Sequence, residues 1–192
     1  MTQLNLPLRT KRLVLRRFHA LDLDAFHAYH SLPETARFLP HEAKSYTQSM
    51  EYVGRYANFV FEKEGDWVCL AIEALDEPGV LLGEVVLKWL AGRGQAEIGW
   101  SLAPEARGRG IGTEAAGALL KLGFEDLGFH RVDAKLDELN TASAALCARL
   151  GMRPESRQVD KWHYKDQWAT ERVYAILAEE WRSRQPAASV AP

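Results

Sequence analysis

Hydrophobic and polar side chains follow regular patterns along the first part of the chain, and these patterns predict its first secondary-structure elements. Apolar and polar residues alternate over 12–18, which is typical of a strand. Asp22 is a suitable N-cap for a helix that ends before Pro33, and Pro33 in turn suits the first position of a short helix to Phe38. The chain is therefore expected to begin with a strand and two helices.

The next helix is marked at its start by a capping box, formed by Ser45 and Gln48. Apolar side chains recur at three- and four-residue steps from there to Gly65, so we expect one helix over this whole stretch. Three strand-like runs follow, and the turns between them are short, which predicts antiparallel neighbours. The three runs are residues 67–75, 80–90 and 95–102.

The pattern changes after residue 103, where a glycine-rich loop opens the C-terminal half of the chain. Helices and strands alternate from there, and Gly151 is expected to end the second of these helices. We predict an α+β fold with a mixed sheet, in one domain over residues 1–184 with a flexible small-residue tail at 185–192. The expected elements are a helix over 113–127, a strand over 130–136, a helix over 141–150 and strands within 154–177.

The composition of the 192 residues is that of a globular domain, with 47% hydrophobic residues and a formal net charge of -2. The 24 basic residues form no block, which argues against nucleic acid as a partner, because phosphate backbones are bound by concentrated positive charge. A membrane span needs about 18 consecutive apolar residues, and the longest candidate, 79–90, is broken by Glu84 and Lys88. Since the N-terminus carries no apolar signal segment, we expect a cytoplasmic protein that binds no membrane.

Cysteine and histidine are too scattered to predict a metal site. Cys69 and Cys147 have no neighbouring cysteine or histidine at the spacing of a zinc site, so we expect two reduced core residues. His27 and His30 share a helical face, but no third ligand lies near them in the sequence. The hypothesis is therefore a protein without a metal.

The stretch from Glu97 to Ala115 combines a strand, a loop with glycines at 108, 110 and 112, and the start of a helix. Glycine allows the main chain to turn sharply and to approach a ligand, and the first N–H groups of a helix have no acceptor within the helix. Arg107 and Arg109 add positive charge, so this stretch favours the binding of a phosphate or pyrophosphate. The alternative is a surface turn with two solvated arginines.

Two nucleotide-binding motifs can be compared with this loop. It lacks the Gly-Lys-Ser/Thr ending of a P-loop, which argues against nucleoside triphosphate hydrolysis. Gly110-x-Gly112-x-x-Ala115, with Asp133 about twenty residues later, fits the loose dinucleotide fingerprint. However, strands joined by tight turns precede the loop in place of strand–helix–strand units, so a dinucleotide-dependent oxidoreductase is the less favoured hypothesis.

Arg107-x-x-Gly110-x-Gly112 is similar to the Q/R-x-x-G-x-G/A signature of the GCN5-related N-acetyltransferases (GNAT), which bind the pyrophosphate of acetyl-CoA at the start of a helix. The resemblance extends from about Leu8 to Trp181, and it looks like the branch of the ribosomal-protein N-terminal acetyltransferases. Each supporting segment is short, but their order and spacing agree with that branch. These segments are Leu8 to Leu13, Glu97 to Trp100, Asn140 to Ser143, Leu150 to Met152, Val173 to Leu177 and Glu180-Trp181.

The resemblance implies a GNAT-like central sheet that is mixed and mostly antiparallel, with helices on both faces. Two parallel strands, expected here at 97–102 and 130–136, would splay apart to admit the pantetheine arm of the cofactor. Pantetheine would bind main-chain groups of one splayed strand, at Trp100, Ser101 and Leu102.

The same resemblance implies which residues hold the rest of acetyl-CoA. Asn140 and Ser143 would face the cofactor from the helix that follows the second splayed strand, although helix capping and packing explain these two residues equally well. The pyrophosphate would be held largely through main-chain N–H groups. The residues expected there are Arg107, Gly108, Arg109, Gly110, Ile111, Gly112 and Thr113.

The reaction that the resemblance implies is the attack of an amine on the thioester of acetyl-CoA. An amine is mostly protonated near pH 7, so a group must accept a proton. Glu97, on the first splayed strand, is our candidate for this general base, and Glu84 on the preceding strand is the second candidate. The alternative for Glu97 is a carboxylate on the polar face of a strand. A main-chain N–H near residues 98–100 would stabilise the oxyanion.

The thiolate of CoA must regain a proton when it leaves. Many members of the family carry a tyrosine at the position of Cys147, which we expect to be a packing residue. Ser143 resembles the serine proposed for this role in the ribosomal-protein branch, so it is our candidate for the donor. Because a thiolate is a tolerable leaving group, a dedicated acid is not required.

Three segments are expected to lie over the groove between the splayed strands and to select the acceptor amine. They are residues 32–46, 91–94 and 158–168. Aromatic rings and carboxylates in the last segment suit a cationic amine, and aromatic side chains also suit a homodimer interface. We therefore expect an N-acetyltransferase for a protein N-terminal amine or a small-molecule amine, with a non-catalytic acyl-CoA-binding module as the alternative. The side chains in question are Asp160, Trp162, His163, Tyr164, Asp166 and Trp168.

Overall fold

The computed structural model describes residues 4–92 and 94–184, and the expected tail at 185–192 lies outside them. The strands are β1 (Leu8–Arg9), β2 (Leu13–Arg16), β3 (Trp67–Ala74), β4 (Leu81–Trp89), β5 (Gln95–Leu102), β6 (Arg131–Asp137), β7 (Arg153–Tyr164) and β8 (Gln167–Leu177). The helices are α1 (Leu23–His30), α2 (Pro33–Ala36), α3 (Tyr46–Ala57), α4 (Ile111–Lys121), α5 (Thr141–Leu150) and α6 (Ala178–Arg184). Shorter helical segments are η1 (Ala20–Asp22), η2 (Pro104–Ala106) and η3 (Leu122–Asp126).

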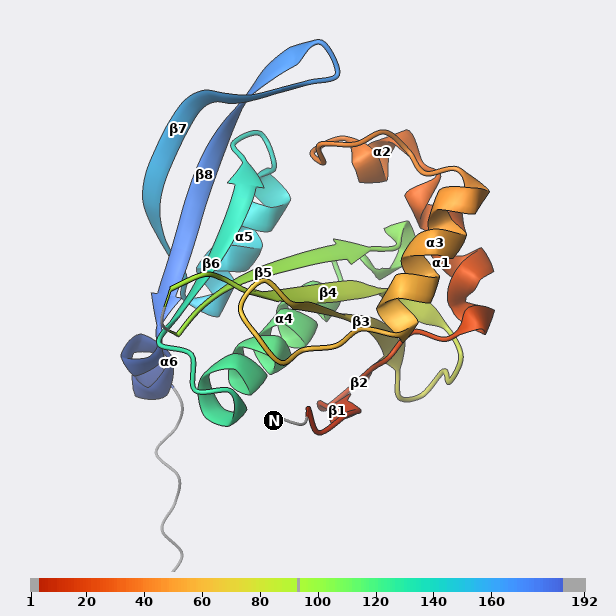
Figure 1. Cartoon of the computed structure of the whole chain (residues 1–192), viewed down its shortest axis with the longest axis horizontal. Coiled ribbons are helices and arrows are strands. Elements are labelled where there is room, and N and C mark those ends of the chain that lie inside the picture. The colour runs from red at the N-terminus through yellow and green to blue at the C-terminus, as the bar shows by residue number, and fades with distance from the viewer. Residues whose placement is uncertain (1–3, 93, 185–192) are drawn as a thin grey trace, which may run out of the picture.

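The strands form one eight-stranded sheet within the described part of the chain, in the order β1-β2-β3-β4-β5-β6-β8-β7 (Figure 1). Neighbouring strands are antiparallel except β5 and β6, which are parallel and are connected through α4. The parallel pairing covers only Gln95–Glu97 against Arg131–Asp133, and beyond it the two strands part. The predicted fold class, a mixed and mostly antiparallel sheet with a splayed parallel pair, is confirmed.

Helices cover both faces of the sheet, as expected (Figure 1). The alternation along β3 shows how this arises, because Val68, Leu70 and Ile72 are buried in one core while Cys69 and Ala71 are buried in the other. The first core also contains apolar side chains of α4 and α5, and the second contains those of α1 and α3. The parting of β5 and β6 therefore lies between two separately packed layers of helices.

The helix predicted over 45–65 is shorter than expected. It begins after Ser45, whose hydroxyl accepts a main-chain hydrogen bond as the capping box predicts, but it ends at Ala57. Phe61 is instead buried in the core of α4 and α5, where its ring centroid lies 5.7 Å from that of Trp89. Packing across the sheet has overridden the helical spacing of this side chain, which is a weaker determinant of structure.

Two other helix starts differ from the prediction. Asp22 precedes α1 as expected, but its carboxylate does not cap that helix and instead accepts two hydrogen bonds of 2.8 Å from the guanidinium of Arg16. The helix predicted from Thr113 begins earlier, at Ile111, because Gly110 adopts the left-handed conformation (φ 77°) just before it. The glycine that was expected to bend the loop is therefore also the N-cap of α4.

Several smaller expectations can be compared with the structure. Gly151 ends α5 in the left-handed conformation (φ 81°), as predicted. Cys69 and Cys147 are both buried and form no disulfide. Across residues 4–92 and 94–184, none of the helices has the length and apolar character needed to cross a membrane.

Candidate functional site

A cavity of about 570 Å³ lies where α4 begins, between β5, α5 and the segment around α2. It brings together residues from three separated parts of the sequence that were expected to bind one ligand. Those residues are Trp100, Ser101, Leu102, Arg107, Gly108, Gly110, Ile111, Gly112, Thr113, Asn140 and Ser143. Four further lining residues, Glu34, Thr35, Phe38 and Leu39, belong to the segment 32–46 that was expected to select the acceptor. The sequence did not assign a binding role to the remaining lining residues, which are Ala106, Ala142, Leu146 and Arg149.

The first turn of α4 presents free main-chain donors to this cavity. The N–H of Glu114 bonds to the carbonyl of Gly110 (3.1 Å), whereas those of Ile111, Gly112 and Thr113 have no acceptor within the described residues. Such groups carry the positive end of the helix dipole and bind anions well. The start of α4 is therefore a candidate anion site at one end of the cavity.

Gly112 is required for packing at this helix start. A Cβ at this residue would lie 2.9 Å from the Cδ1 of Leu146 on α5 and 3.1 Å from the Cδ1 of Leu102 on β5. Both distances are shorter than an ordinary contact, so a side chain would push α4 away from its two neighbours. The glycine therefore keeps the first N–H groups of α4 close to the walls of the cavity.

Cations lie on two sides of the anion site. Arg107 donates to the carbonyl of Leu102 (3.1 Å) and to the hydroxyl of Thr35 (3.0 Å), and it thereby spans the cavity from β5 to α2. Arg149, a residue that the sequence did not single out, lines the cavity from α5 and donates to the hydroxyl of Thr113 (3.1 Å). Both guanidinium groups add positive charge beside the free N–H groups.

Arg109 is placed differently from Arg107. It is absent from the lining of the cavity, and its guanidinium lies 3.5 Å from the carbonyl of Glu105. Its own carbonyl accepts a hydrogen bond from Arg12 (3.2 Å). Within the described residues, this arginine therefore contributes to the shape of the loop through its main chain.

The glycine-rich loop is also tied to the N-terminal segment. Besides the Arg109 carbonyl, Arg12 binds the carboxylate of Glu114 on α4 through its Nε (2.7 Å), and the hydroxyl of Thr10 donates to the same carboxylate (2.6 Å). Partial burial raises the pKa of this carboxyl group, but the hydrogen bonds from Thr10 and Arg12 outweigh it, and the pKa of Glu114 is lowered. The negative charge next to the anion site is thus neutralised by a cation of the same chain.

The opposite wall of the cavity joins β5 to α5. The indole N–H of Trp100 donates to the hydroxyl of Ser143 (3.1 Å), and the side-chain oxygen of Asn140 accepts the main-chain N–H of Ser143 (3.1 Å). Asn140 is therefore the N-cap of α5, as the sequence suggested. Because an indole can only donate, Ser143 acts as the acceptor in this bond and retains its own hydroxyl proton for another partner.

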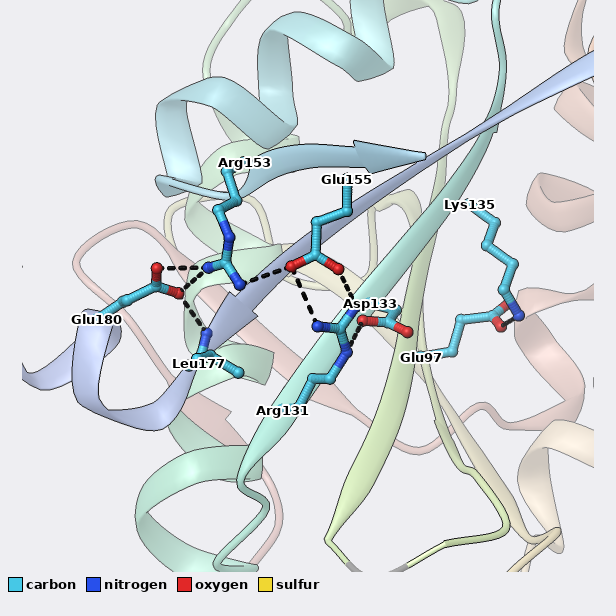
Figure 2. Close-up of polar contacts among 8 residues, drawn as sticks. All are labelled: Glu97, Arg131, Asp133, Lys135, Arg153, Glu155, Leu177 and Glu180. Carbon is cyan, nitrogen blue, oxygen red and sulfur yellow. Dashed lines mark hydrogen bonds and ion pairs between the residues drawn. The ribbon is translucent and has the colours of Figure 1, made fainter. Parts of the chain in front are cut away.

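Glu97 lies at the last paired position of β5, directly opposite Asp133 of β6, where the two strands begin to part. Figure 2 shows that its carboxylate meets Lys135, with 2.5 Å between Oε2 and Nζ. Glu97 is absent from the lining of the cavity at α4. Gly99 follows on the same face of β5, and a Cβ there would meet nothing within 4 Å, so open space adjoins Glu97.

Glu84, the second candidate for the general base, lies on β4 opposite Ser101 of β5, and Cys147 lies on α5. Glu84 is buried and bonds to the hydroxyl of Tyr29 and to the Nε2 of His30 (2.9 Å). Cys147 is fully buried, and burial raises the pKa of its thiol to about 12. Neither residue lines the cavity at α4.

A second cavity, of about 740 Å³, adjoins the first and shares Glu34 and Phe38 with it. It lies between the segment around α2 and the β7–β8 hairpin, which extends beyond the rest of the sheet (Figure 1). Two of the three expected acceptor segments line it. Residues 91, 92 and 94 line neither cavity, and residue 93 lies outside the described part. The lining residues include Glu42, Asp137, Glu138, Tyr164, Lys165 and Trp168.

No group of three or more metal-ligating side chains gathers anywhere within residues 4–92 and 94–184. The two histidines that share a face of α1 have other partners, since His27 bonds to Ser49 (3.0 Å) and His30 bonds to Glu84 (2.9 Å). The polar groups that the described residues bring to the site are main-chain N–H groups, carboxylates, hydroxyls and guanidinium groups. These suit a long ligand with an anionic end at α4 and a reactive end at the parted strands.

Comparisons with known proteins agree with this geometry. A model of the acetyltransferase (GNAT) domain matches residues 12–153. The chain is 29% identical over 172 residues to the uncharacterized N-acetyltransferase YnaD of Bacillus subtilis (strain 168), which covers 90% of this chain and 97% of the relative. A solved acetyltransferase (GNAT family) from Bacillus anthracis superposes with a TM-score of 0.83 at 27% identity, over 91% of this chain and all of that one.

A more distant structure shares the fold alone. It is described as a putative ribosomal-protein-serine acetyltransferase from Vibrio cholerae. It superposes with a TM-score of 0.71 at 18% identity, over 90% of this chain and 98% of that one. At this identity, the similarity concerns the arrangement of the backbone.

Proposed function

Because this chain belongs to the acetyltransferase (GNAT) family and is an acetyl-CoA-dependent N-acetyltransferase, we propose that its acceptor is a primary amine of a protein N-terminus or of a small molecule. The proposal of a protein N-terminus draws on the segments that resemble the ribosomal-protein branch. The structural similarity to the Vibrio cholerae protein supports it at the level of the fold. A small-molecule amine remains the other form of the same proposal.

The observation that supports this function best is the anion site at the start of α4. Three N–H groups, at Ile111, Gly112 and Thr113, have no acceptor among the described residues, and they face a cavity that also reaches the free edge of β5. A pyrophosphate would accept from these groups and from Arg149, while the amides of pantetheine would pair with the strand edge at Trp100 to Leu102. Acetyl-CoA supplies the thioester on which the amine acts.

Glu97 is proposed as the general base. Its carboxylate lies where β5 and β6 part, and the missing side chain of Gly99 leaves room for an amine beside it. An ammonium group that enters this space would give a proton to the carboxylate, directly or through a water, before the nitrogen attacks the acetyl carbon. Main-chain N–H groups on the free edge of β5, at residues 98–100, are proposed to stabilise the oxyanion.

Ser143 is proposed to donate a hydrogen bond to the departing thiolate. Its oxygen already accepts from Trp100, so its hydroxyl proton points elsewhere, and the residue lines the cavity together with Asn140. Cys147, the residue at the position where many family members carry tyrosine, is buried behind this wall and stays in its packing role.

The second cavity is proposed to hold the body of the acceptor. Tyr164 and Trp168 offer ring faces, and Glu34 and Glu42 offer carboxylates without recorded partners in the described residues. Lys165 donates to the carbonyl of Ala36 (2.5 Å) and so joins the hairpin to the segment around α2. Rings and free carboxylates attract cations, which supports an amine as the occupant.

The first experiment is calorimetry with acetyl-CoA and CoA, followed by thiol-release assays over a panel of amines and N-terminal peptides. We expect both nucleotides to bind and at least one amine to be acetylated. Glu97→Gln should lower kcat by a factor of about 100 or more with unchanged acetyl-CoA affinity, as removal of a general base does. Ser143→Ala should lower kcat by about tenfold.

Three outcomes would contradict these proposals. Absence of acetyl-CoA binding at millimolar concentration would remove the cofactor site. Binding without turnover of any amine would favour a non-catalytic acyl-CoA-binding module. Undiminished turnover in both variants would reject the roles of Glu97 and Ser143 while leaving the reaction itself in place.

A further inference from the structure

Lys135 crosses the gap between the two parted strands. It lies on β6, beyond the last parallel pair of Glu97 with Asp133, and its ammonium reaches back to the carboxylate of Glu97 on β5. The distance between Nζ and Oε2 is 2.5 Å, and both side chains are partly exposed, at 37% and 30% (Figure 2). The ion pair thus spans the opening at which the thioester and the amine are proposed to meet.

The surroundings of Lys135 keep it positively charged. Partial burial alone would lower the pKa of Lys135, but its hydrogen bond and attraction to Glu97 outweigh this, and the pKa is raised. Glu171 on β8 and Asp133 on β6 add smaller attractions of the same sign. The side chain is therefore a poor nucleophile in its own right and a stable cationic partner for Glu97.

The ion pair uses only one oxygen of Glu97. Oε2 accepts from Lys135, while Oε1 has no recorded partner within residues 4–92 and 94–184. On the other side of β5, Lys88 of β4 is the register partner of Glu97, and the described residues give Lys88 no hydrogen bond or ion pair. Of these two lysines, Lys135 on β6 forms an ion pair with Glu97, and Lys88 on β4 does not.

We propose that Lys135 is a positioning residue for the general base, a proposal that rests on the role proposed for Glu97. By fixing Oε2 across the opening, Lys135 keeps Oε1 directed at the space beside Gly99, where the acceptor amine approaches. The proton that leaves the amine goes to Oε1, and Lys135 keeps its own protons throughout. The residue thus orients the carboxylate without touching either substrate.

The test compares two lysine variants, Lys135→Met and Lys88→Met, in the full-length protein with an amine that the wild type acetylates. Methionine keeps most of the length of the side chain and removes its charge. We expect Lys135→Met to lower kcat by about tenfold, through loss of orientation, while acetyl-CoA affinity measured by calorimetry stays the same. Lys88→Met should leave kcat within about twofold of the wild type, because Lys88 forms no ion pair with Glu97 or with any other described residue.

Two further readouts separate positioning from a structural role. Lys135→Arg should recover most of kcat, since a guanidinium can make the same ion pair. In a Glu97→Gln background, Lys135→Met should have no further effect on kcat, since the group that it positions is gone.

The outcomes distinguish this proposal from the one on which it rests. If Glu97→Gln turns over like the wild type, the general base lies elsewhere and both proposals fall. If Glu97→Gln is impaired but Lys135→Met is not, or if Lys88→Met is equally impaired, only the positioning role is overturned. An equal and additive loss from Lys135→Met in the wild-type and Glu97→Gln backgrounds would assign Lys135 a purely structural role. Acetylation of Lys135 itself, detected by mass spectrometry after incubation with acetyl-CoA alone, would likewise overturn it.

Discussion

The two halves of the site present different groups to a ligand, main-chain groups in one half and side chains in the other. The half around α4 uses the main chain, with free N–H groups at the helix start and a strand edge at β5. The half between α2 and the β7–β8 hairpin uses side chains, among them Glu34, Tyr164 and Trp168. The ion pair of Glu97 with Lys135 lies where β5 and β6 part. Main-chain donors serve any chain that keeps the fold, whereas side chains can change from one protein to the next. The first half therefore suits a shared cofactor and the second suits an individual acceptor.

The variant with the largest expected effect should disrupt only the half of the site around α4. Gly110→Val places a β-branched residue at φ 77°, with its Cβ 3.4 Å from Arg12, and such strain costs about 1–3 kcal/mol. Because the strained residue is the N-cap that aims the N–H groups of α4, we expect acetyl-CoA affinity measured by calorimetry to fall by about 100-fold. The KM of the amine should change little.

Gly79→Val is the matched control for that variant. Gly79 also has a positive φ of 87°, and a Cβ there would meet nothing within 4 Å, but it lies in the turn before β4. The control should therefore share the backbone strain and keep the affinity for acetyl-CoA. Equal losses of affinity in the two variants would show that general destabilisation, rather than the anion site, explains the result.

A smaller effect is expected from filling the space beside Glu97, where the acceptor amine is proposed to enter. Gly99→Val adds a side chain to β5 where a Cβ meets nothing, so the fold has room for it and valine suits a strand. Because the new side chain fills the space beside Glu97, we expect the KM of the amine to rise by about tenfold while acetyl-CoA affinity is kept. Unchanged kinetics would show that the acceptor reaches the thioester by another route.

The smallest expected effect is on acetyl-CoA affinity, and it comes from removing the side chain of Arg149 in the half around α4. Arg149→Met removes a cation and its hydrogen bond to Thr113, but it leaves the free N–H groups of α4 in place. We expect acetyl-CoA affinity to fall by about fivefold, and the loss should shrink at high salt because charges are screened. A loss as large as that of Gly110→Val would contradict the idea that the main chain carries most of the binding.

Most of the fold could be predicted because its patterns are local. The tight turns between β3, β4 and β5 and the capping residue Ser45 all act within a few residues of one another, and each was found at its expected place. The end of α3 was missed because Phe61 is fixed by packing against Trp89 across the sheet. Sequence spacing carries no information about such distant contacts.

The site shows the same division between local and distant signals. The loop from Arg107 to Thr113 was recognisable because its glycines serve a local backbone need. Arg149 was missed because it reaches the anion site only through the packing of α5 against α4, and Lys135 was missed because its partner lies on a strand that is remote in sequence. One signal was available for Lys135. It lies two residues after Asp133 on β6, and residues two apart in a strand lie on the same face of the sheet.

Arg12 donates one hydrogen bond to the Arg109 carbonyl and another to Glu114, and these bonds fix the glycine-rich loop to the N-terminal segment. Both helical layers pack without this arginine, because neither core includes it. Fusing a tag that displaces Arg12 would accordingly leave both cores intact and weaken the binding of the nucleotide. Weak CoA binding by a tagged protein would then be a consequence of the tag, and it should be judged against the untagged chain.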